Sequence, residues 1–512
     1  MKKIITIILI LLLIFLSGCG KENINPTSNL SVGDSSLSEF VSDNYETVQT
    51  SSEVITSSEA FQIENSSNIT TSFVSDKIEK PSSMSDLFSQ TSNAQTSSAQ
   101  LSSTQSSSAL APSQKPSSAP SSSALASSEK TSSSQNSSET ILKPNKKRFS
   151  AIWISYYEFP FENKNEAEAK KAVSNMMEKI AKQGYTAVFC HVRANADAFY
   201  PSKYFPYAKQ LTGIAGKNPG YDPLEVMIWA SKKYGLEFHA WINPYRVSNT
   251  TTNPNELADG HIAAKWLADG SNRAVVHEKG IYFNPASTDV QKLVLNGIRE
   301  ILDKYNVDGI HFDDYFYPSG ITAQFDSKQY NEYLQNTEIP LSLDDWRRAN
   351  VNALVSSAYR ICHAQKTIFG ISPAGNMSLD NSHDNYKVLY ADVALWMSQE
   401  GYVDYILPQL YFGYNHPVEK ARYKTLLDIW CALPKHKNLK FYVGLGAYKM
   451  NENCDDKEEW HNETDLLARQ VTDAVKSGAD GIAVFSYEAS TLENSHNALQ
   501  IKNMFEAIDK LF

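Results

Sequence analysis

The amino-acid sequence predicts an α/β fold, a (β/α)8 TIM barrel preceded by a disordered Ser/Thr-rich linker. In the C-terminal part, short apolar stretches alternate with amphipathic helical patterns, as expected of parallel strands joined by helical crossovers. Eight such stretches imply closure into a barrel, and the length of about 365 residues suits one decorated barrel. No Gly-x-Gly-x-x-Gly turn follows the first stretch, which argues against the alternative of an open doubly wound sheet.

The first residues have the pattern of a bacterial lipoprotein signal. Two lysines precede a run over residues 4–16 that is apolar except for Thr6, which is about the length of a signal-peptide core and short for a membrane-spanning helix. A serine and a glycine then lead directly into Cys19. We therefore expect residues 1–18 to be cleaved and Cys19 to be lipidated, which gives an extracytoplasmic protein anchored to the cell membrane. An ordinary cleaved signal or a short uncleaved anchor is the alternative.

The composition changes completely over residues 19–145. Ser, Thr, Gln, Ala and Pro dominate there, aromatic residues are sparse, and no helical or strand period is visible. Such a segment buries too little apolar surface to offset its ordering entropy, so we expect a flexible tether. A random coil of about 125 residues has a root-mean-square end-to-end distance of roughly 60 Å. The globular domain then comprises residues 146–512.

Charge and cysteine content exclude several classes of protein. The formal net charge of −10 argues against a nucleic-acid-binding surface. Besides Cys19, the widely spaced cysteines are Cys190, Cys362, Cys431 and Cys454. Because none belongs to a C-x-x-C pair, the pattern predicts neither a zinc cluster nor a disulfide framework, and we expect isolated buried thiols. No metal and no cofactor are expected.

The strands and helices of the barrel can be placed along the chain. The eight expected strands are Phe149–Ser155, Thr186–Arg193, Glu237–Asn243, Gly309–Tyr315, Thr367–Pro373, Tyr405–Tyr411, Phe441–Ala447 and Gly481–Tyr487. Helical patterns cover Glu166–Gln183, Pro223–Tyr234, Thr288–Tyr305, Leu343–Ala364, Val418–Ala432 and Asp465–Ser477. Glycines such as Gly184, Gly235 and Gly478 follow three of these helices as stop signals. Barrel enzymes carry their chemistry at the C-terminal ends of the strands, which narrows the search for a site.

The end of the fourth strand holds the strongest catalytic candidate. Alternate residues of a barrel strand face the interior, so His311, Asp313 and Tyr315 should point inward near the top. An inward carboxylate costs desolvation unless it has a partner, which makes Asp313 the first candidate for catalysis. Asp314 has the opposite parity, but a strand end can twist it back to the rim, so it is the second.

Other strand ends offer polar and aromatic side chains to the same mouth. The expected substrate-binding residues are His191, Arg193, His239, Trp241, Asn243, Arg246, His311, Tyr315, Gln409 and Tyr411. Side chains with several hydrogen-bonding atoms, combined with aromatic rings, are suited to binding sugars. Glu488 at the end of the eighth strand is a further catalytic candidate. Glu158 and Asp197, just past the first and second strands, either order their loops or act directly.

These strand-end segments resemble the glycosyl-hydrolase-like family 10, a group of bacterial secreted and lipoprotein barrels of the DUF187 type. The matching segments are Asp197–Ser202, Asn218–Leu224, His239–Arg246, Tyr282–Pro285 and Val307–Pro318. The resemblance covers the chain from about Arg148 onward, and its last segment is long and specific. It implies a barrel glycosidase, and it links the protein to the glycan strands of peptidoglycan, particularly strands without stem peptides.

Two more distant likenesses concern the fourth strand. The segment Asp308–Asp313 is similar to the motif of α-amylase-type barrels, whose final Asp is the nucleophile and corresponds to Asp313. The acid of those enzymes has no counterpart in Ser372–Gly375. The segment is also similar to the chitinase motif, in which a Glu stands where this sequence has Tyr315. That difference argues against the substrate-assisted mechanism of chitinases.

We therefore expect a glycosidase that acts on a polysaccharide, with Asp313 as nucleophile or base and Asp314 or Glu488 as acid. Arg193 and Arg246 are suited to pair with the carboxylate of muramic acid. Two other classes remain open. One is a metal-dependent hydrolase with His191, His239 and His311 as ligands, although no H-x-H or H-E-x-x-H spacing is present. The other is a catalytically inactive barrel that binds glycan.

Overall fold

The computed structural model describes residues 149–377, 384–452, 454–492 and 495–511. The expected signal peptide, the lipidation of Cys19 and the linker over residues 19–145 lie outside the described residues and stay predictions. Within the described part of the chain, no helix has both the length and the hydropathy needed to cross a membrane.

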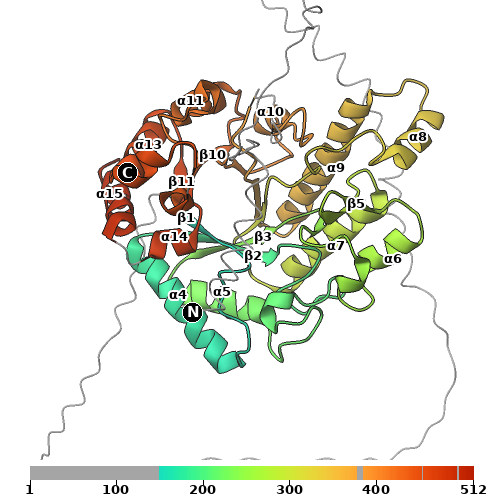
Figure 1. Ribbon diagram of the computed structural model, residues 1–512, viewed down its shortest axis with the longest axis horizontal. Coiled ribbons are helices and arrows are strands. Elements are labelled where there is room, and N and C mark those ends of the chain that lie inside the picture. The colour runs from blue at the N-terminus through green and yellow to red at the C-terminus, as the bar shows by residue number, and fades with distance from the viewer. Residues whose placement is uncertain (1–148, 378–383, 453, 493–494, 512) are drawn as a thin grey trace, which may run out of the picture. The chain divides into compact units, whose positions relative to one another are not determined.

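Eight parallel strands close into a barrel with helices around it, which confirms the predicted fold class (Figure 1). Around the barrel the strands follow the order β1-β11-β10-β9-β8-β7-β3-β2. Their bounds are β1 (Phe149–Ile154), β2 (Ala187–Arg193), β3 (Glu237–Ile242), β7 (Gly309–Phe312), β8 (Ile368–Ile371), β9 (Tyr405–Ile406), β10 (Lys440–Leu445) and β11 (Gly481–Val484). Each barrel strand therefore pairs with its neighbours along the chain, and β1 pairs with β11 to close the ring.

Most strands are shorter at their C-terminal ends than the sequence predicted. The largest difference is β9, which ends at Ile406 whereas the apolar pattern continued to Tyr411. Pro408 explains this end, because proline has no N–H to donate to a neighbouring strand. Beyond it, Gln409 keeps isolated bridges to Ala374 and Gly444 on the two neighbouring segments, so it remains at the barrel end.

The helices form the outer layer. They are α4 (Glu166–Gln183), α5 (Pro223–Lys233), α6 (Ile262–Ala268), α7 (Thr288–Lys304), α8 (Ser327–Gln335), α9 (Leu343–Ala364), α10 (Val393–Ser398), α11 (Tyr423–Ala432), α12 (Lys457–Asn462), α13 (Leu466–Lys476), α14 (Tyr487–Thr491) and α15 (Ser495–Leu511). Local signals set their ends: Asn165 and Glu168 form a capping box at the start of α4, and Gly184 closes that helix with a φ of 108°. The sequence patterns predicted α4 and α9 to the residue, but they did not predict the short helices or α15.

A small antiparallel sheet is inserted after β3. Its strands β4 (Arg246–Ser248), β5 (Ala274–His277) and β6 (Gly280–Phe283) pair in the order β4-β6-β5. Figure 1 shows β5 and α6 to one side of the barrel. Arg246, which lies beyond the predicted third strand Glu237–Asn243, is the first residue of β4. The inserted sheet therefore begins next to the end of a barrel strand.

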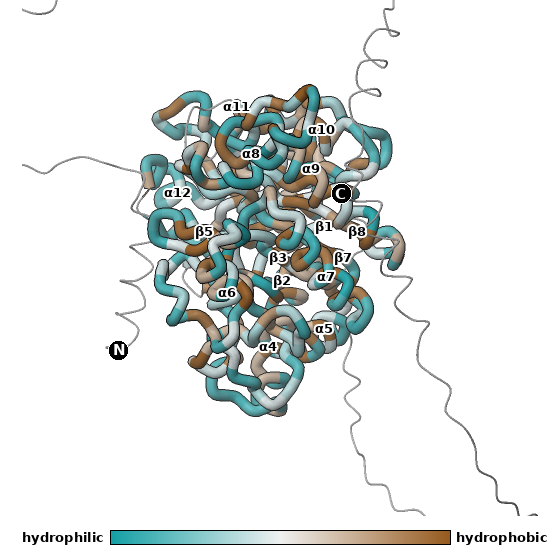
Figure 2. Tube along the Cα trace, turned by 90° about the vertical axis from the view of Figure 1, so that its right-hand side faces the viewer, coloured by the Kyte–Doolittle hydropathy of each residue, from teal (hydrophilic) through white to brown (hydrophobic). Residues whose placement is uncertain are grey.

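Two hydrophobic cores hold the domain together. The larger lies between the strands and the helices, and it contains the outward residues of β7, Ile310 and Phe312. The smaller fills the barrel interior and includes Trp153, Phe189 and Tyr405. Figure 2 shows hydrophilic residues on many peripheral loops and hydrophobic ones around α9 and the strands. The barrel interior is therefore packed, and a ligand site is expected at the C-terminal ends of the strands.

A repeated polar clasp joins strands in pairs at their N-terminal ends. Asp308 before β7 accepts a hydrogen bond from the backbone N–H of Phe238 in β3, at 2.8 Å. Asp404 accepts one from Phe369 at 2.7 Å, and Asp480 accepts one from Phe441 at 2.9 Å. In each pair the Asp backbone N–H donates to the carbonyl of the same phenylalanine. Thr186 plays the same part toward Ser150, so strands β1 and β2, β3 and β7, β8 and β9, and β10 and β11 are each clasped.

Candidate active site

Asp313 lies at the mouth of the barrel, by which we mean the C-terminal ends of the barrel strands. It follows β7 directly, and only 5% of its surface is exposed. Three N–H groups donate to its carboxylate. The Trp241 indole donates to Oδ2 at 3.1 Å, while the Gln409 amide and the Asp314 backbone donate to Oδ1 at 3.1 and 2.9 Å. Residues from the ends of β3, β7 and β9 thus converge on one carboxylate, as the sequence analysis predicted.

Asp314 follows Asp313 directly, its backbone N–H donates to Oδ1 of Asp313, and the two carboxyls interact electrostatically. Strand β7 ends at Phe312, so strict alternation no longer directs the side chain of Asp314 away from the mouth. Burial, and then the neighbouring charge of Asp313, hold the pKa of Asp314 well above its usual value. Burial also raises the pKa of Asp313, although its hydrogen bonds and Arg246 oppose that shift. Such a pair retains one proton at a pH where isolated carboxyls are ionised.

Arg246 provides the positive charge next to this pair. Its Nε and Nη2 both donate to the carbonyl of Ala194, at 3.1 and 3.0 Å. Its guanidinium lies 4.6 Å from the ring centre of Tyr315. Tyr315 itself is 45% exposed, so its ring forms part of the rim. The mouth therefore combines a cation, a carboxyl pair and an accessible aromatic face.

His191 and Trp241 form a stacked pair at the mouth. Their ring centres are 3.2 Å apart and nearly parallel, and Tyr156 meets His191 edge-on at 5.6 Å. Both ring nitrogens of His191 are buried and have no hydrogen-bond partner among the described residues. Burial, followed by the charge of Arg246, holds its pKa well below the usual range. His191 is therefore neutral and supports the indole that donates to Asp313.

His311 and His239 belong to the barrel filling below the mouth. The Trp153 indole donates to Nε2 of His311 at 3.3 Å, and an indole N–H can only donate, so the His311 proton is on Nδ1. The Nδ1–H of His311 donates to the hydroxyl oxygen of Tyr405 at 3.0 Å. The hydroxyl hydrogen of Tyr405 is then free to be donated to Nδ1 of His239 at 3.1 Å. Burial lowers the pKa of His311 well below its usual value. The expected role of His239 in lining the mouth is wrong, because it precedes Trp241 by two residues and so lies one layer deeper.

Arg193 does not reach the mouth, contrary to expectation. Its guanidinium lies against Gly297 of α7 and 4.5 Å from the ring centre of Phe205, outside the strands. The pairing of β2 with β3 shifts register between His191 and Arg193. Such a bulge reverses the alternation of inward and outward side chains. His191 and Arg193, which were predicted to face the same side of β2, therefore face opposite sides.

Asn243 has a local structural role. It is buried directly after β3, and its Oδ1 accepts the backbone N–H of Arg246 at 3.4 Å. This contact turns the chain from β3 into β4, and it thereby positions Arg246. Asn243 thus acts on the mouth through Arg246.

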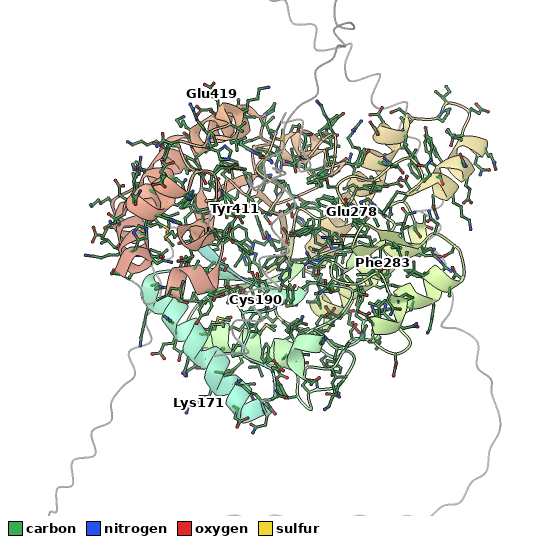
Figure 3. The ribbon with its side chains drawn as sticks, viewed as in Figure 1. Lys171, Cys190, Glu278, Phe283, Tyr411 and Glu419 are labelled. Atoms are coloured by element: carbon green, nitrogen blue, oxygen red, sulfur yellow. The ribbon has the colours of Figure 1, made fainter. Side chains whose placement is uncertain are left out.

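An aromatic group lines the side of the mouth that Gln409 and Tyr411 occupy. Tyr411 stacks on Phe485 at 5.9 Å and meets Tyr448 edge-on at 5.7 Å. Figure 3 places Tyr411 near the barrel centre, whereas Lys171 on α4 and Glu419 just before α11 lie at the periphery. Tyr448, in the turn after β10, was not predicted as part of the mouth, because nothing in its local sequence indicates that it folds inward.

Glu488 lies elsewhere on the rim. It is exposed in the first turn of α14, and its backbone N–H donates to Glu158 at 2.7 Å. Glu158 also accepts from the Ser486 hydroxyl at 2.7 Å and from the Ser155 backbone at 2.6 Å. Burial raises the pKa of Glu158 to about 7, although these hydrogen bonds oppose the shift. Glu158 thus joins the ends of β1 and β11, whereas Asp314 is the carboxyl next to Asp313.

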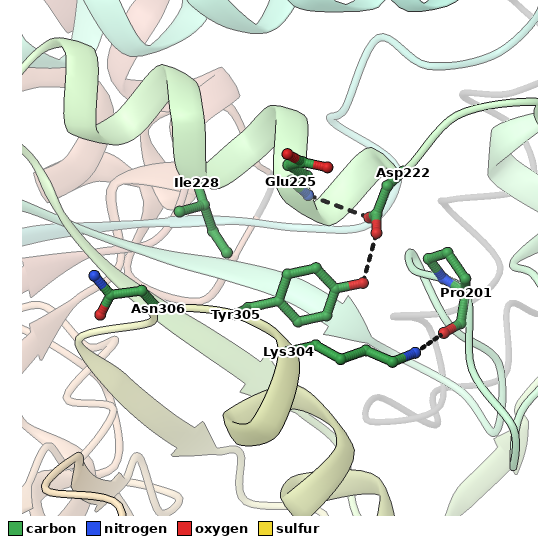
Figure 4. A pocket seen from close by; sticks show the side chains of 7 residues that line it. All are labelled: Pro201, Asp222, Glu225, Ile228, Lys304, Tyr305 and Asn306. Carbon is green, nitrogen blue, oxygen red and sulfur yellow. Dashed lines mark hydrogen bonds between the residues drawn. The ribbon is translucent and has the colours of Figure 1, made fainter. Parts of the chain in front are cut away.

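No metal-binding group is found at the mouth among the described residues, and one surface hollow lies well away from it. Among the described residues, no group of three or more His, Cys, Asp or Glu side chains is arranged to hold a metal ion. A hollow of about 420 Å³ lies between the start of α5 and the end of α7 (Figure 4). Tyr305 there donates to Asp222 at 2.6 Å, and Lys304 donates to the carbonyl of Pro201. None of the residues lining it belongs to the mouth.

Comparison with known proteins agrees with the geometry. The chain is 38% identical over 324 residues to glycosyl hydrolase YngK of Bacillus subtilis, a match that spans 60% of each protein. It is 31% identical over 318 residues to glycosyl hydrolase DigH of Escherichia coli, covering 57% of this chain and 69% of DigH. The catalytic domain of a β-amylase from Paenibacillus polymyxa superposes with a TM-score of 0.46 at 9% identity, over 70% of this chain and 99% of that domain. The model of the family described as Glycosyl hydrolase-like 10 matches residues 148–462. The chain therefore belongs to the glycosyl hydrolase-like 10 family.

Proposed function

We propose that the protein is a cell-envelope glycosidase that hydrolyses O-glycosidic bonds in a polysaccharide, with peptide-free peptidoglycan glycan strands as the substrate. The observation that carries this proposal is a pair of consecutive acidic residues directly after β7, of which Asp313 is nearly buried and held by N–H donors from the ends of three strands. Family membership supports the same reaction type. The lipoprotein signal that ends at Cys19 supports a location at the membrane, next to the cell wall.

The roles of the two carboxyls follow from their surroundings. Glycoside hydrolysis requires one group to protonate the leaving oxygen and another to assist attack at the anomeric carbon. Asp314 is the acid, because its raised pKa keeps it protonated where a free carboxyl is ionised. Asp313, fixed by three N–H donors, is the partner that assists attack as nucleophile or base.

The substrate class follows from the charge and the rings at the rim. Tyr315 and Tyr411 present aromatic faces that suit the apolar side of a sugar ring. Arg246 is the cation suited to the carboxylate of a muramic acid residue. Arg193 is not available for this task, since it packs against α7.

The test is product analysis by mass spectrometry after residues 146–512 have been incubated with peptide-free glycan strands. We expect the wild type to release short oligosaccharides, whose ends identify the bond cut. Replacing a group that takes part in acid–base catalysis typically costs about 10²–10⁴-fold in rate, so we expect Asp313→Asn and Asp314→Asn to lose release by this order. Glu338→Ala, which alters an exposed carboxylate in the loop after α8, is the matched control.

The two alternative functions give different results in the same assay. A glycan-binding barrel without activity releases no product, and its Asp313→Asn variant changes only the retention of strands. A metal-dependent hydrolase loses activity on exhaustive chelation and regains it with added metal. Product release that survives both chelation and the Asp313→Asn change contradicts the assignment of the carboxyl pair.

A further inference from the structure

Two exposed tyrosines lie on loops that leave opposite sides of the barrel. Tyr157 follows β1 and is 47% exposed, and Tyr386 lies between β8 and α10 and is 46% exposed. Four steps lead from β1 to β8 through β11, β10 and β9, and four lead there through β2, β3 and β7. Both loops begin at the C-terminal ends of their strands, so they leave the mouth on opposite sides.

A chain of ring contacts joins Asp313 to Tyr157. The Trp241 indole, which donates to Asp313 at 3.1 Å, stacks on His191 with the ring centres 3.2 Å apart. Tyr156 meets His191 edge-on at 5.6 Å, and Tyr157 meets Tyr156 edge-on at 5.2 Å. Edge-to-face pairs at such separations are favourable, so these contacts hold the exposed ring of Tyr157 in place at the mouth.

A chain of hydrogen bonds joins Asp313 to Tyr386 from the other side. The Gln409 amide donates to Asp313 at 3.1 Å, and the Gln409 backbone forms a β-bridge with Ala374. Asn385 directly precedes Tyr386 in the chain, and its side-chain amide donates to the carbonyl of Ala374 at 2.7 Å. The segment that carries Tyr386 is therefore attached to the same end of the barrel as the carboxylate.

The ring of Tyr386 is held on one face. The guanidinium of Arg348, near the start of α9, lies 3.9 Å from the ring centre. Arg348 also donates to the backbone carbonyl of Tyr386 at 3.0 Å and to Asp345 at 2.7 Å. A guanidinium over one face of a ring is attracted to it, and it leaves the other face to a ligand. A ring that is fixed before a ligand arrives loses little conformational freedom on binding.

Exposure alone does not place an aromatic ring at the mouth, as two other side chains show. Tyr204 is 38% exposed in the loop after β2, but its neighbour Phe205 packs against Gly297 of α7, outside the strands. Trp229 is 43% exposed on α5, in the outer layer of helices. Both have exposures close to those of the two mouth tyrosines, and they therefore provide controls.

We propose that a glycan strand lies across the mouth from Tyr157 to Tyr386, with a sugar ring stacked on each tyrosine and the scissile bond between them at Asp313. This inference rests on the proposed glycosidase function. A site that holds sugars on both sides of the bond to be cut acts within a strand, so the enzyme is endo-acting. An exo-acting site, in contrast, receives a chain end and binds sugars beyond the bond on one side only.

The first test measures binding without turnover, in the Asp313→Asn background. Calorimetry reports the Kd for long peptide-free glycan strands and for a tetrasaccharide of the same sugars. We expect Tyr157→Ala and Tyr386→Ala each to weaken binding of long strands by about fivefold, the order expected for one lost stacking contact. The loss should be smaller for the tetrasaccharide, which is too short to contact both rings. Tyr204→Ala, the control, should change the Kd by less than about twofold.

Two further variants separate ring stacking from a general disturbance of the loops. Tyr157→Phe and Tyr386→Phe keep the ring and remove only the hydroxyl, so they should recover most of the affinity that the alanine variants lose. The double alanine variant should show the product of the two single losses, because the rings are far apart and contact different sugars of one strand. Losses in only one of the two alanine variants, or equal losses in Tyr204→Ala, overturn the inference.

The second test follows the lengths of the products that the wild type releases from long strands. We expect fragments of many lengths to form early, so that the mean strand length falls before any disaccharide accumulates. A single short product, released while the remaining strands keep nearly their full length, shows exo action and overturns the inference. If the wild type cuts no strand at all, the proposed function fails, and the binding test still decides whether both tyrosines hold the strand.

Discussion

Trp241 offers a way to weaken the hold on Asp313 without removing the ring that stacks on His191. In Trp241→Phe the stacked face remains, while the N–H that donates to Asp313 Oδ2 is lost. A hydrogen bond to a charged group contributes about 1.5–3 kcal/mol, so we expect kcat on glycan strands to fall by about tenfold or more, with KM nearly unchanged. Trp266→Phe in α6, whose ring packs on Phe283, is the matched control. A change confined to KM contradicts a positioning role for the indole.

The pH dependence of activity tests the charge next to the carboxyl pair. The positive charge of Arg246 lowers the pKa of both Asp313 and Asp314, so its removal raises both. Activity requires a protonated acid and is lost as pH rises through the pKa of that acid. In Arg246→Gln we therefore expect the alkaline limb of the kcat/KM profile to move to higher pH, whereas Arg360→Gln on α9 leaves it in place. An alkaline limb that moves to lower pH has the wrong sign for this assignment.

The alternation of side chains along a strand predicted whether a residue faces the barrel interior. It did not predict how far the residue lies from the mouth, or where a β-bulge reverses the alternation. Asp313, Trp241 and Gln409 meet as the alternation indicated. His239 has the correct side but lies a layer too deep, because two residues along a strand correspond to about 6–7 Å. Arg193 has the wrong side, because one extra residue in the pairing of β2 reverses parity. Neither error leaves a signal in the local sequence.

At the scale of elements, the clasps at the strand starts make a measurable contribution to stability. In Asp308→Ala the backbone N–H of Phe238 loses its partner. A buried donor left without a partner costs about 1–3 kcal/mol, so we expect a lower free energy of unfolding by this amount. The measurement is denaturant unfolding, and kcat should stay unchanged because the clasp lies at the opposite end of the barrel from Asp313.

A double variant separates local clasps from a general loss of structure. Asp308→Ala and Asp480→Ala act on different strand pairs, so their effects on the free energy of unfolding should add to within about 0.5 kcal/mol. Glu338→Ala, at an exposed position, should change that free energy by less than about 0.5 kcal/mol. Strong non-additivity shows that the two clasps do not act on separate pairs of strands.

The repeated strands could be predicted from sequence, whereas the inserted sheet could not. Each barrel strand carries a short apolar stretch, and the clasped pairs repeat an acidic residue before it in Asp308, Asp404 and Asp480. Strands β4 to β6 are only three or four residues long and lie between polar loops. Their stability comes from contacts with the barrel, which a local pattern does not contain.

At the scale of the whole molecule, the lipid anchor is the prediction to check first. We expect full-length protein grown with a clickable fatty acid to carry the label on Cys19. Cys19→Ala should lose the label completely, whereas Cys454→Ala, a change at a half-buried thiol of the barrel domain, should keep it. The readout is in-gel fluorescence. A labelled Cys19→Ala protein contradicts lipidation at this residue.

The direction of β1 determines at which end of the barrel the preceding chain enters the domain. All eight barrel strands are parallel, so Phe149 at the start of β1 lies at the end of the barrel opposite to Asp313. Whatever chain precedes residue 149 therefore joins the domain on its closed side. A long polymer can therefore reach the mouth without passing the point at which the chain enters the domain.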